Sequence, residues 1–154
     1  MNKMILMRGI PGGGKSTRAR ELALTHIAEG GSSVAICSTD DYHMEDGVYV
    51  FKPKMLGDFH VRNQIRAYDL MKDGVQLVII DNTNIKRKDM TIYTSNARAC
   101  KYEVEEEIVG KEFLVPHMDM DPHAFAGYIN TCAERNTHGV PKDVIERMAR
   151  TFEV

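Results

Sequence analysis

The residues most able to do chemistry form a glycine-rich run at positions 9–17, Gly-Ile-Pro-Gly-Gly-Gly-Lys-Ser-Thr. The run has the form G-x-x-x-x-G-K-[ST], the P-loop or Walker A pattern. Its glycines let backbone N–H groups approach an anion closely. Lys15 supplies a cation for β- and γ-phosphates, and the Ser16 hydroxyl is suited to ligate Mg²⁺. The residues expected to hold the nucleotide are Gly12, Gly13, Gly14, Lys15, Ser16 and Thr17.

The flanking elements match what this pattern needs. Residues 3–7 form a short apolar run typical of a strand. Residues 16–29 are predicted to form a helix, with Ala19, Leu22 and Ile27 on one apolar stripe. The helix would point the positive end of its dipole at the phosphates. A glycine-rich turn with an incidental lysine is the alternative, and this strand, turn and helix context disfavours it.

Acidic and amide side chains follow two further predicted strands. Asp40 and Asp41 come after residues 33–37, and Asp81 follows the continuously apolar residues 76–80. Parallel strands place their carboxyl ends at one edge of a sheet, where ligands bind. We therefore expect these carboxylates to converge with the P-loop. The candidate substrate-binding residues at this edge are Asp41, Tyr42, Asn82 and Thr83.

Phosphoryl transfer needs a phosphate cradle, a metal ion, a group that orients the nucleophile, and a cation for the migrating charge. Asp40 is the candidate base for an acceptor hydroxyl, with helix capping as the alternative. Asp81 resembles a Walker B acid that holds Mg²⁺ through water, or it anchors its own loop. The loop after it offers hydrogen bonds to a substrate, or serves only as a turn.

Two cations complete the candidate catalytic set. Lys15 acts on the phosphates, and Arg135 is the candidate transition-state cation, on a segment at 135–141 that is suited to close as a lid. A surface arginine is the alternative for Arg135. Arg18, one turn into the first helix, is expected to lie on a solvated face.

The remaining pattern predicts alternating strands and helices. A small hairpin or an extended excursion is expected around 46–51, and a strand at 102–109. Helices are expected at 54–72, 88–99, 122–136 and 142–152, while 113–123 gives a weak pattern. Such alternation predicts an α/β fold, a three-layer αβα sandwich of the P-loop kinase type with a mainly parallel sheet. Residues 1–154 are expected to form one such domain.

Composition narrows the function classes. Lys and Arg total 20 and Asp and Glu total 22, a formal net charge of −2, which does not favour a strongly basic nucleic-acid binder. The three cysteines indicate reduced thiols, and no signal peptide or membrane span is recognised, so a cytoplasmic protein without a membrane partner is expected. The acidic run at 103–107 indicates a solvated face. The histidines without metal-ligand spacing are His43, His60, His117 and His123.

With these residues placed, the sequence resembles the polynucleotide-kinase-like branch of P-loop kinases. The resemblance rests on residues 8–17, 38–42, 77–84 and 135–141, which follow the family order. It implies ATP- and Mg²⁺-dependent transfer of the γ-phosphate to a hydroxyl. It also implies that Asp40 is the general base, that Arg135 is the lid arginine on the donor phosphates, and that Asn82 and Thr83 lie near the acceptor.

One position departs from the family pattern. Phage-type 5′-hydroxyl kinases carry an arginine three residues after the base, where it contacts the acceptor phosphate, and this chain has His43. Three hypotheses remain: a kinase of polynucleotide 5′-hydroxyls, a kinase of another hydroxyl on a small molecule, a nucleotide sugar or a modified base in DNA, and a nucleotide-binding interaction module with little turnover. The basic residues 86–88 favour the first, and His43 favours the second.

Overall fold

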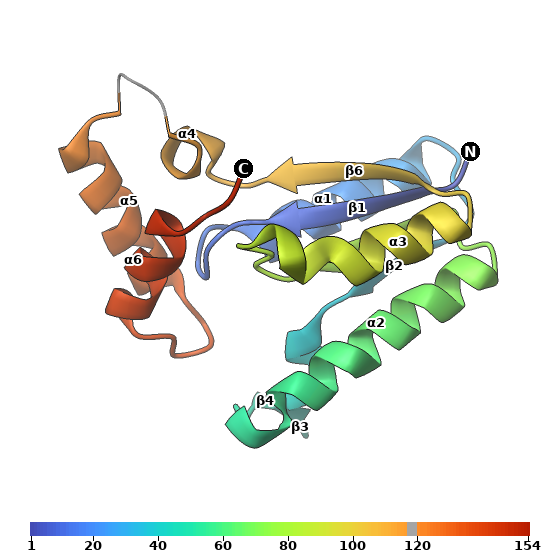
Figure 1. Cartoon of the computed structure of the whole chain (residues 1–154), viewed down its shortest axis with the longest axis horizontal. Coiled ribbons are helices and arrows are strands. Elements are labelled where there is room, and N and C mark those ends of the chain that lie inside the picture. The colour runs from blue at the N-terminus through green and yellow to red at the C-terminus, as the bar shows by residue number, and fades with distance from the viewer. Residues whose placement is uncertain (117–119) are drawn as a thin grey trace.

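A parallel sheet of four strands, in the order β2-β5-β1-β6, forms the centre of the protein. The structure is a computed structural model that describes residues 1–116 and 120–154. In Figure 1 the arrows of β1 and β6 point to the same end of the sheet. The expected α/β architecture with a parallel sheet is therefore confirmed. The strands are β1 (Lys3–Arg8), β2 (Val34–Cys37), β5 (Leu77–Asp81) and β6 (Glu103–Ile108).

Burial explains the strand order. All five residues of β5 are buried, which is what a strand covered on both faces requires. β5 pairs with β1 on one side, placing Ile79 opposite Ile5, and with β2 on the other. β6 has glutamate at four of its six positions and occupies the edge, as its pattern of apolar residues among glutamates predicts.

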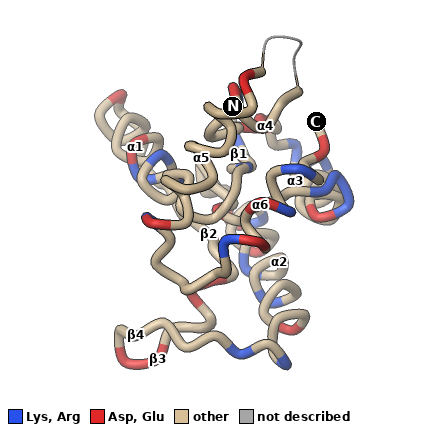
Figure 2. Tube along the Cα trace, turned by 90° about the vertical axis from the view of Figure 1, so that its left-hand side faces the viewer, with Lys and Arg blue, Asp and Glu red and all other residues tan. Residues whose placement is uncertain are grey.

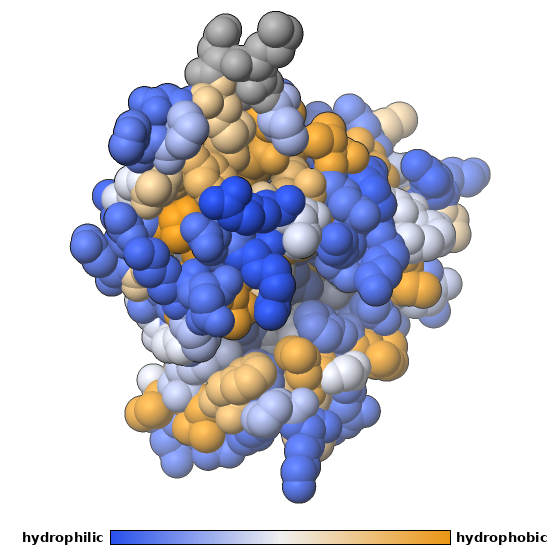
Figure 3. Space-filling model, turned by 60° about the vertical axis from the view of Figure 1, so that its left-hand side comes forward, coloured by the Kyte–Doolittle hydropathy of each residue, from blue (hydrophilic) through white to orange (hydrophobic). Residues whose placement is uncertain are grey.

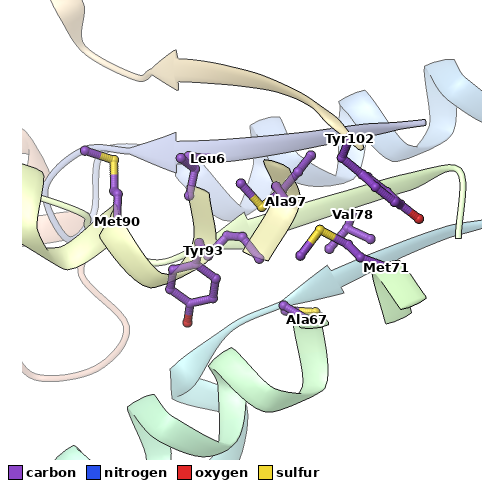
Figure 4. Packing of buried hydrophobic residues seen from close by; sticks show 11 residues of the cluster. Leu6, Ala67, Met71, Val78, Met90, Tyr93, Ala97 and Tyr102 are labelled. Carbon is purple, nitrogen blue, oxygen red and sulfur yellow. The ribbon is translucent and has the colours of Figure 1, made fainter. Parts of the chain in front are cut away.

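Helices cover both faces of this sheet. Helix α1 (Lys15–Ala28) packs through Ala19 on one face, against Ile5 and Ile79. Helices α2 (Leu56–Lys72) and α3 (Thr91–Ala99) cover the other face. Figure 4 shows side chains of both helices meeting those of β1 and β5 in this second layer. These contacts make the three layers that the sequence predicts.

A third group of helices lies beyond the carboxyl ends of the strands (Figure 1). It consists of α4 (Lys111–Leu114), α5 (Pro122–Arg135) and α6 (Lys142–Arg150). These helices share a separate apolar cluster that includes Ile10 of the P-loop. The phosphate loop thus lies between the sheet and a second, smaller hydrophobic core. The predicted three-layer sandwich does not include this second core.

Short elements connect these layers. The predicted hairpin is present as β3 and β4, and its turn has φ values of +50° at Asp46 and +81° at Gly47, as tight hairpin turns favour. On α2, the apolar Ile65 is 55% exposed, whereas the polar Asn63 takes a core position. The short elements are η1 (Thr39–His43), β3 (Met44–Glu45), β4 (Val48–Tyr49), η2 (Pro53–Met55) and η3 (Arg87–Met90).

The glutamates of β6 form ion pairs with basic groups across an exposed face. Glu105 lies 2.7 Å from Lys3, and Glu107 accepts a hydrogen bond from Arg18 at 2.8 Å. Glu103, Glu105 and Glu106 are nevertheless exposed, so the face is solvated as expected, and Arg18 is a partly exposed ion-pair partner on it. Within the described ranges, no helix has both the length and the apolar character needed to cross a membrane.

Arg8, the last residue of β1, is fully buried. Its guanidinium donates to the carbonyls of Asn84, Ile85 and Glu153, and pairs with Glu106 at 3.0 Å. Burial lowers the pKa of Arg8, and Glu106 opposes that shift. The side chain connects the end of β1 to the loop after β5 and to the C-terminal segment. Because Arg8 directly precedes the P-loop, these contacts fix the position where the loop begins.

Replacing Arg8 with alanine is expected to lower the free energy of unfolding by about 3–5 kcal/mol, because several buried partners lose their donor. Chemical denaturation measures this loss. Arg87 is a matched control, since it binds the same Glu106 at 2.8 Å but from an exposed position. Arg87→Ala should cost less than about 1 kcal/mol. Equal losses in the two variants would contradict a special role for the buried arginine.

Candidate active site

The P-loop adopts a backbone that only glycine accommodates easily. Gly12 has φ +77° and Gly14 has φ +98°, both in the left-handed region. A Cβ on Gly12 would lie 2.0 Å from the carbonyl oxygen of Cys132 in α5. The glycines therefore serve two purposes: they shape the loop and they let α5 pack directly against it.

Lys15 lies across this loop. Its Nζ donates a hydrogen bond to the carbonyl of Ile10 at 3.2 Å. Burial lowers the pKa of Lys15, while the negative charges of Asp81 and Asp40 act in the opposite direction. The ammonium group is therefore within the electrostatic influence of both carboxylates, and its place beside the phosphates stays a prediction.

Ser16 and Asp81 form the expected metal-type pair. The Ser16 hydroxyl donates to Asp81 Oδ2 at 2.8 Å, and Asp81 is only 7% exposed. Oxygen ligands of this kind suit Mg²⁺, which binds through few protein groups and keeps several waters. The two side chains thus fit the ion that the sequence implies. Among the described residues, no group of three or more His, Cys, Asp and Glu side chains is arranged to hold a metal, and His117 lies outside them.

Asp40 lies in η1, at the carboxyl end of β2. Its Oδ2 is 3.2 Å from Nδ1 of His138, and its Oδ1 is 3.5 Å from the hydroxyl of Tyr49. The alternative role as a helix cap is wrong, because Ser38 is the N-cap of η1 and no side chain caps it. Its carboxylate is about half exposed. Asp40 is therefore accessible and faces side chains from other elements.

Asp41 and Tyr42 turn toward α2 instead. The Asp41 carboxylate lies 3.8 Å from Arg66, and the Tyr42 ring packs against Phe59. Partial burial raises the pKa of Asp41, and Arg66 opposes that shift. An open depression of about 380 Å³ beside α2 is lined by Tyr42, Arg62, Ile65, Arg66, Asp69, Leu70 and Asp73. These two predicted substrate residues thus border the site on its α2 side.

The Asn82–Thr83 loop is tied to both neighbouring segments. Asn82 Oδ1 accepts a hydrogen bond from the Thr39 backbone at 2.9 Å, and its Nδ2 is 3.4 Å from the Tyr93 hydroxyl. The Thr83 carbonyl accepts from the Gly9 backbone at 3.0 Å. The loop therefore joins η1 to the P-loop. These contacts favour the turn interpretation for the Asn82 side chain, and its role toward an acceptor stays a prediction.

Arg135 is the last residue of α5, the helix that packs on the P-loop. Its side chain is exposed and makes no ion pair or hydrogen bond with another residue of the described ranges. The charge is near enough to Cys132 to lower the pKa of that thiol, although burial raises it more. Arg135 is thus at the rim of the phosphate loop, and its catalytic role stays a prediction.

Two residues at this site carry no role in the sequence prediction. His138, in the 135–141 segment, contacts Asp40, and Tyr49 of the hairpin stacks on the His138 ring at 4.0 Å between centroids. His138 lies within the 135–141 segment that carries the family resemblance, so the sequence offers a reason to consider it. Nothing in the hairpin sequence marks Tyr49 as a site residue. Figure 2 shows the hairpin and α2 projecting side by side below the sheet.

His43 and the basic run at 86–88 also differ from expectation. His43 is 0% exposed and packs between Phe51 and Phe59, so it supports the site from inside. Arg87 of the basic run is held by Glu106. Figure 3 views the molecule with the left-hand side of Figure 1 turned forward. Hydrophilic side chains cross the middle of this face, with apolar side chains above and below them. Arg87 is therefore less available to an acceptor than its sequence suggests, whereas Lys88 is exposed.

The geometry can be compared with known proteins. The family model AAA_33, described as an AAA domain, matches residues 4–154. NEDD4-binding protein 2 from Homo sapiens is 34% identical over 151 residues, which is 97% of this chain and 8% of that protein. The chain thus spans a small part of the length of this relative.

Solved structures similar to the chain share its fold at low identity. The Pnkp1/Rnl/Hen1 RNA repair complex contains a chain with TM-score 0.64 and 17% identity, covering 97% of this chain and 43% of that one. A gluconokinase from Sinorhizobium meliloti 1021 has TM-score 0.59 and 14% identity, covering 99% and 75%. Kti12 from Chaetomium thermophilum, in complex with ADP-AlF3, has TM-score 0.58 and 16% identity, covering 98% and 80%. The protein has the fold of P-loop kinases.

Proposed function

Because the chain belongs to the AAA_33 family of AAA domains, we propose that it is an ATP-dependent phosphotransferase that moves the γ-phosphate to a hydroxyl acceptor. One observation carries the proposal. The carboxylate of Asp40 is about half exposed, yet its charge acts on Lys15 of the phosphate loop. A carboxylate at that place suits an incoming hydroxyl, and a protein that only bound nucleotide would not need it.

The proposed mechanism assigns each step to residues of this chain. The glycine backbone and Lys15 would bind the β- and γ-phosphates. Ser16 and Asp81 would hold Mg²⁺, which would supply positive charge to offset that of the phosphates. Asp40 would direct the acceptor hydroxyl and remove its proton from this edge of the sheet. Arg135 would neutralise charge that develops on the transferred group.

A polynucleotide 5′-hydroxyl is the acceptor we favour. The likeness to a chain of an RNA repair complex supports this choice at the level of fold. Arg62 and Arg66 line the depression beside α2, next to Tyr42, and offer guanidinium groups to a phosphate. Because His43 is buried, this pair would have to do what the phage-type arginine does. A small molecule, a nucleotide sugar or a modified DNA base is the alternative acceptor.

The direct test is incubation of the protein and Mg²⁺ with γ-labelled ATP and a panel of acceptors. The panel includes 5′-hydroxyl DNA and RNA oligonucleotides, the same oligonucleotides with a 5′-phosphate, nucleosides and simple sugars. Label on the 5′-hydroxyl oligonucleotides alone is the expected result. Label on a sugar or nucleoside would leave the kinase proposal standing and replace the acceptor. Nucleotide binding without transfer to any acceptor would favour an interaction module.

Arg135→Ala is expected to lower kcat on the order of 10³-fold while ATP binding changes little, because the cation matters most when negative charge develops in transfer. Single-turnover transfer and nucleotide titration measure the two effects separately. Arg147→Ala, an exposed arginine on α6, is the matched control and should keep full activity. If Arg135→Ala keeps nearly full kcat, the residue is only a surface arginine.

A further inference from the structure

Two side chains from distant segments hold the carboxylate of Asp40, one at each oxygen. His138, in the segment after α5, places its Nδ1 atom 3.2 Å from Asp40 Oδ2. Tyr49, in β4, places its hydroxyl 3.5 Å from Asp40 Oδ1. The Tyr49 and His138 rings also stack on each other, with centroids 4.0 Å apart and planes 18° apart. The three side chains therefore form one cluster in which each contacts the other two.

The segment that carries His138 is held in shape by its own contacts. The Asn136 side chain bridges it, because Nδ2 donates to the Val140 carbonyl at 2.7 Å and Oδ1 accepts from the His138 backbone at 3.0 Å. Gly139 has φ +69°, which turns the chain directly after the histidine. Val140 packs against the cluster of α5 and α6. The position of the imidazole is thus set before any substrate binds.

The same segment packs against the phosphate loop. A Cβ on Gly12 would lie 2.0 Å from the Cys132 carbonyl oxygen and 3.1 Å from the Asn136 backbone nitrogen. That nitrogen donates to the Cys132 carbonyl at 2.9 Å, where α5 ends. Residues 132–138 therefore reach from a glycine of the phosphate loop to the carboxylate of Asp40. The placement of this carboxylate relative to the loop depends on the segment.

Tyr49 is suited to donate to the same carboxylate. Burial, together with the charge of Asp40, raises the pKa of Tyr49 to about 12, so the phenol keeps its proton at neutral pH. The ring also meets the buried His43 edge-on, with centroids 5.7 Å apart, which anchors it from the inside. An ionised carboxylate offers about four lone pairs, so these two donors leave room for an acceptor hydroxyl.

We propose that His138 is a positioning residue that fixes the Asp40 carboxylate in the orientation that receives the proton of the acceptor hydroxyl, with Tyr49 as its support. The inference rests on the proposed phosphotransferase function and keeps Asp40 as the base within it. Without these two donors, the half-exposed carboxylate would turn about its side-chain bonds. A displacement of about 1 Å at a reacting group costs about 10²-fold in rate.

The transfer step itself is the one already proposed. As the acceptor oxygen bonds to the γ-phosphorus, the bond from that phosphorus to the β–γ bridging oxygen breaks and ADP leaves. The acceptor proton moves to a carboxylate oxygen of Asp40, which later releases it to water. His138 neither binds the substrate nor takes its proton in this step.

The kinetic test uses the full chain, ATP·Mg²⁺ and whichever acceptor the labelling panel identifies. His138→Ala is expected to lower kcat by about 10²-fold, with little change in the Kd for ATP or the KM for the acceptor. His138→Asn, whose amide N–H replaces the Nδ1 donor, should recover a large part of kcat. His123→Ala is the matched control, because it removes an exposed histidine at the other end of α5 and should keep full activity.

Combined variants distinguish positioning from a general effect on the fold. In the Asp40→Asn background, His138→Ala should cause no further loss of rate, because a positioning residue acts only through the group that it positions. A residue that only stabilised the fold would lower the rate by the same factor in both backgrounds. Tyr49→Phe removes one donor but keeps the ring stack, so its loss of kcat should stay below about 10-fold.

Two results would overturn the inference while leaving the proposed function in place. One is full kcat in His138→Ala, and the other is an equal further loss when His138→Ala is added to Asp40→Asn. Absence of transfer to any acceptor by the wild-type protein would instead overturn the proposed function, and the positioning role with it.

Discussion

Lys15→Ala is expected to abolish both phosphate transfer and the stabilisation of the protein by ATP·Mg²⁺. Lys15 contacts the loop carbonyl of Ile10 rather than the apolar core, so the variant should still fold. A ligand at about 100 times its Kd stabilises a protein by about 2.7 kcal/mol. Thermal unfolding with and without nucleotide should therefore show a clear shift for the wild type and none for the variant.

The control for this prediction is Lys142→Ala, which removes an exposed lysine at the start of α6. It should keep the nucleotide-dependent shift and the activity. Loss of the shift in both variants would point to a general charge effect. An undiminished shift in Lys15→Ala would contradict the assignment of residues 9–17 as the phosphate site.

Asp40→Asn is expected to reduce transfer by up to about 10⁴-fold while ATP still binds. Asparagine keeps the shape and one acceptor oxygen but removes the negative charge. That charge is required for Asp40 to take the proton of the acceptor hydroxyl. Loss of a carboxylate that acts on Lys15 should leave nucleotide affinity unchanged or slightly improved.

The measurements are kcat, the Kd for ATP and the free energy of unfolding on one preparation. Asp41→Asn is a matched neighbour, since its carboxylate faces Arg66 on the α2 side. It should alter the KM for the acceptor more than kcat. Normal turnover in Asp40→Asn would move the base to another group, with Asp41 as the next candidate.

Local sequence determines much of this protein. The glycine run, its lysine and its serine predict a loop–helix phosphate site because few other residue types permit those backbone angles. Continuous burial of β5 and the alternation of β6 follow directly from their apolar patterns, and both strands lie where expected. The turn at Asp46 and Gly47 is similarly local. These features depend on neighbours in the chain, so the sequence suffices.

Contacts between side chains of distant segments cannot be predicted from local sequence. The Asp40–His138 contact joins residues from opposite ends of the chain, and the stack on Tyr49 depends on where the hairpin folds. Likewise, the position three residues after Asp40, where phage-type kinases carry an arginine, holds a histidine whose burial the local sequence does not indicate. No local pattern encodes which of two faces a short 3₁₀ turn presents.

The chain's own residues therefore determine that there is a phosphate loop, a parallel sheet, and acidic and amide groups at the ends of its strands. Only the tertiary structure decides which of these groups face the loop. Ser16 and Asp81 meet because β1 and β5 are neighbours in the sheet, and His138 meets Asp40 because α5 packs on glycine at the P-loop. Strand order and helix packing depend on how the apolar surface of the entire chain is buried. This burial involves contacts between many segments, so no single segment of the sequence determines it.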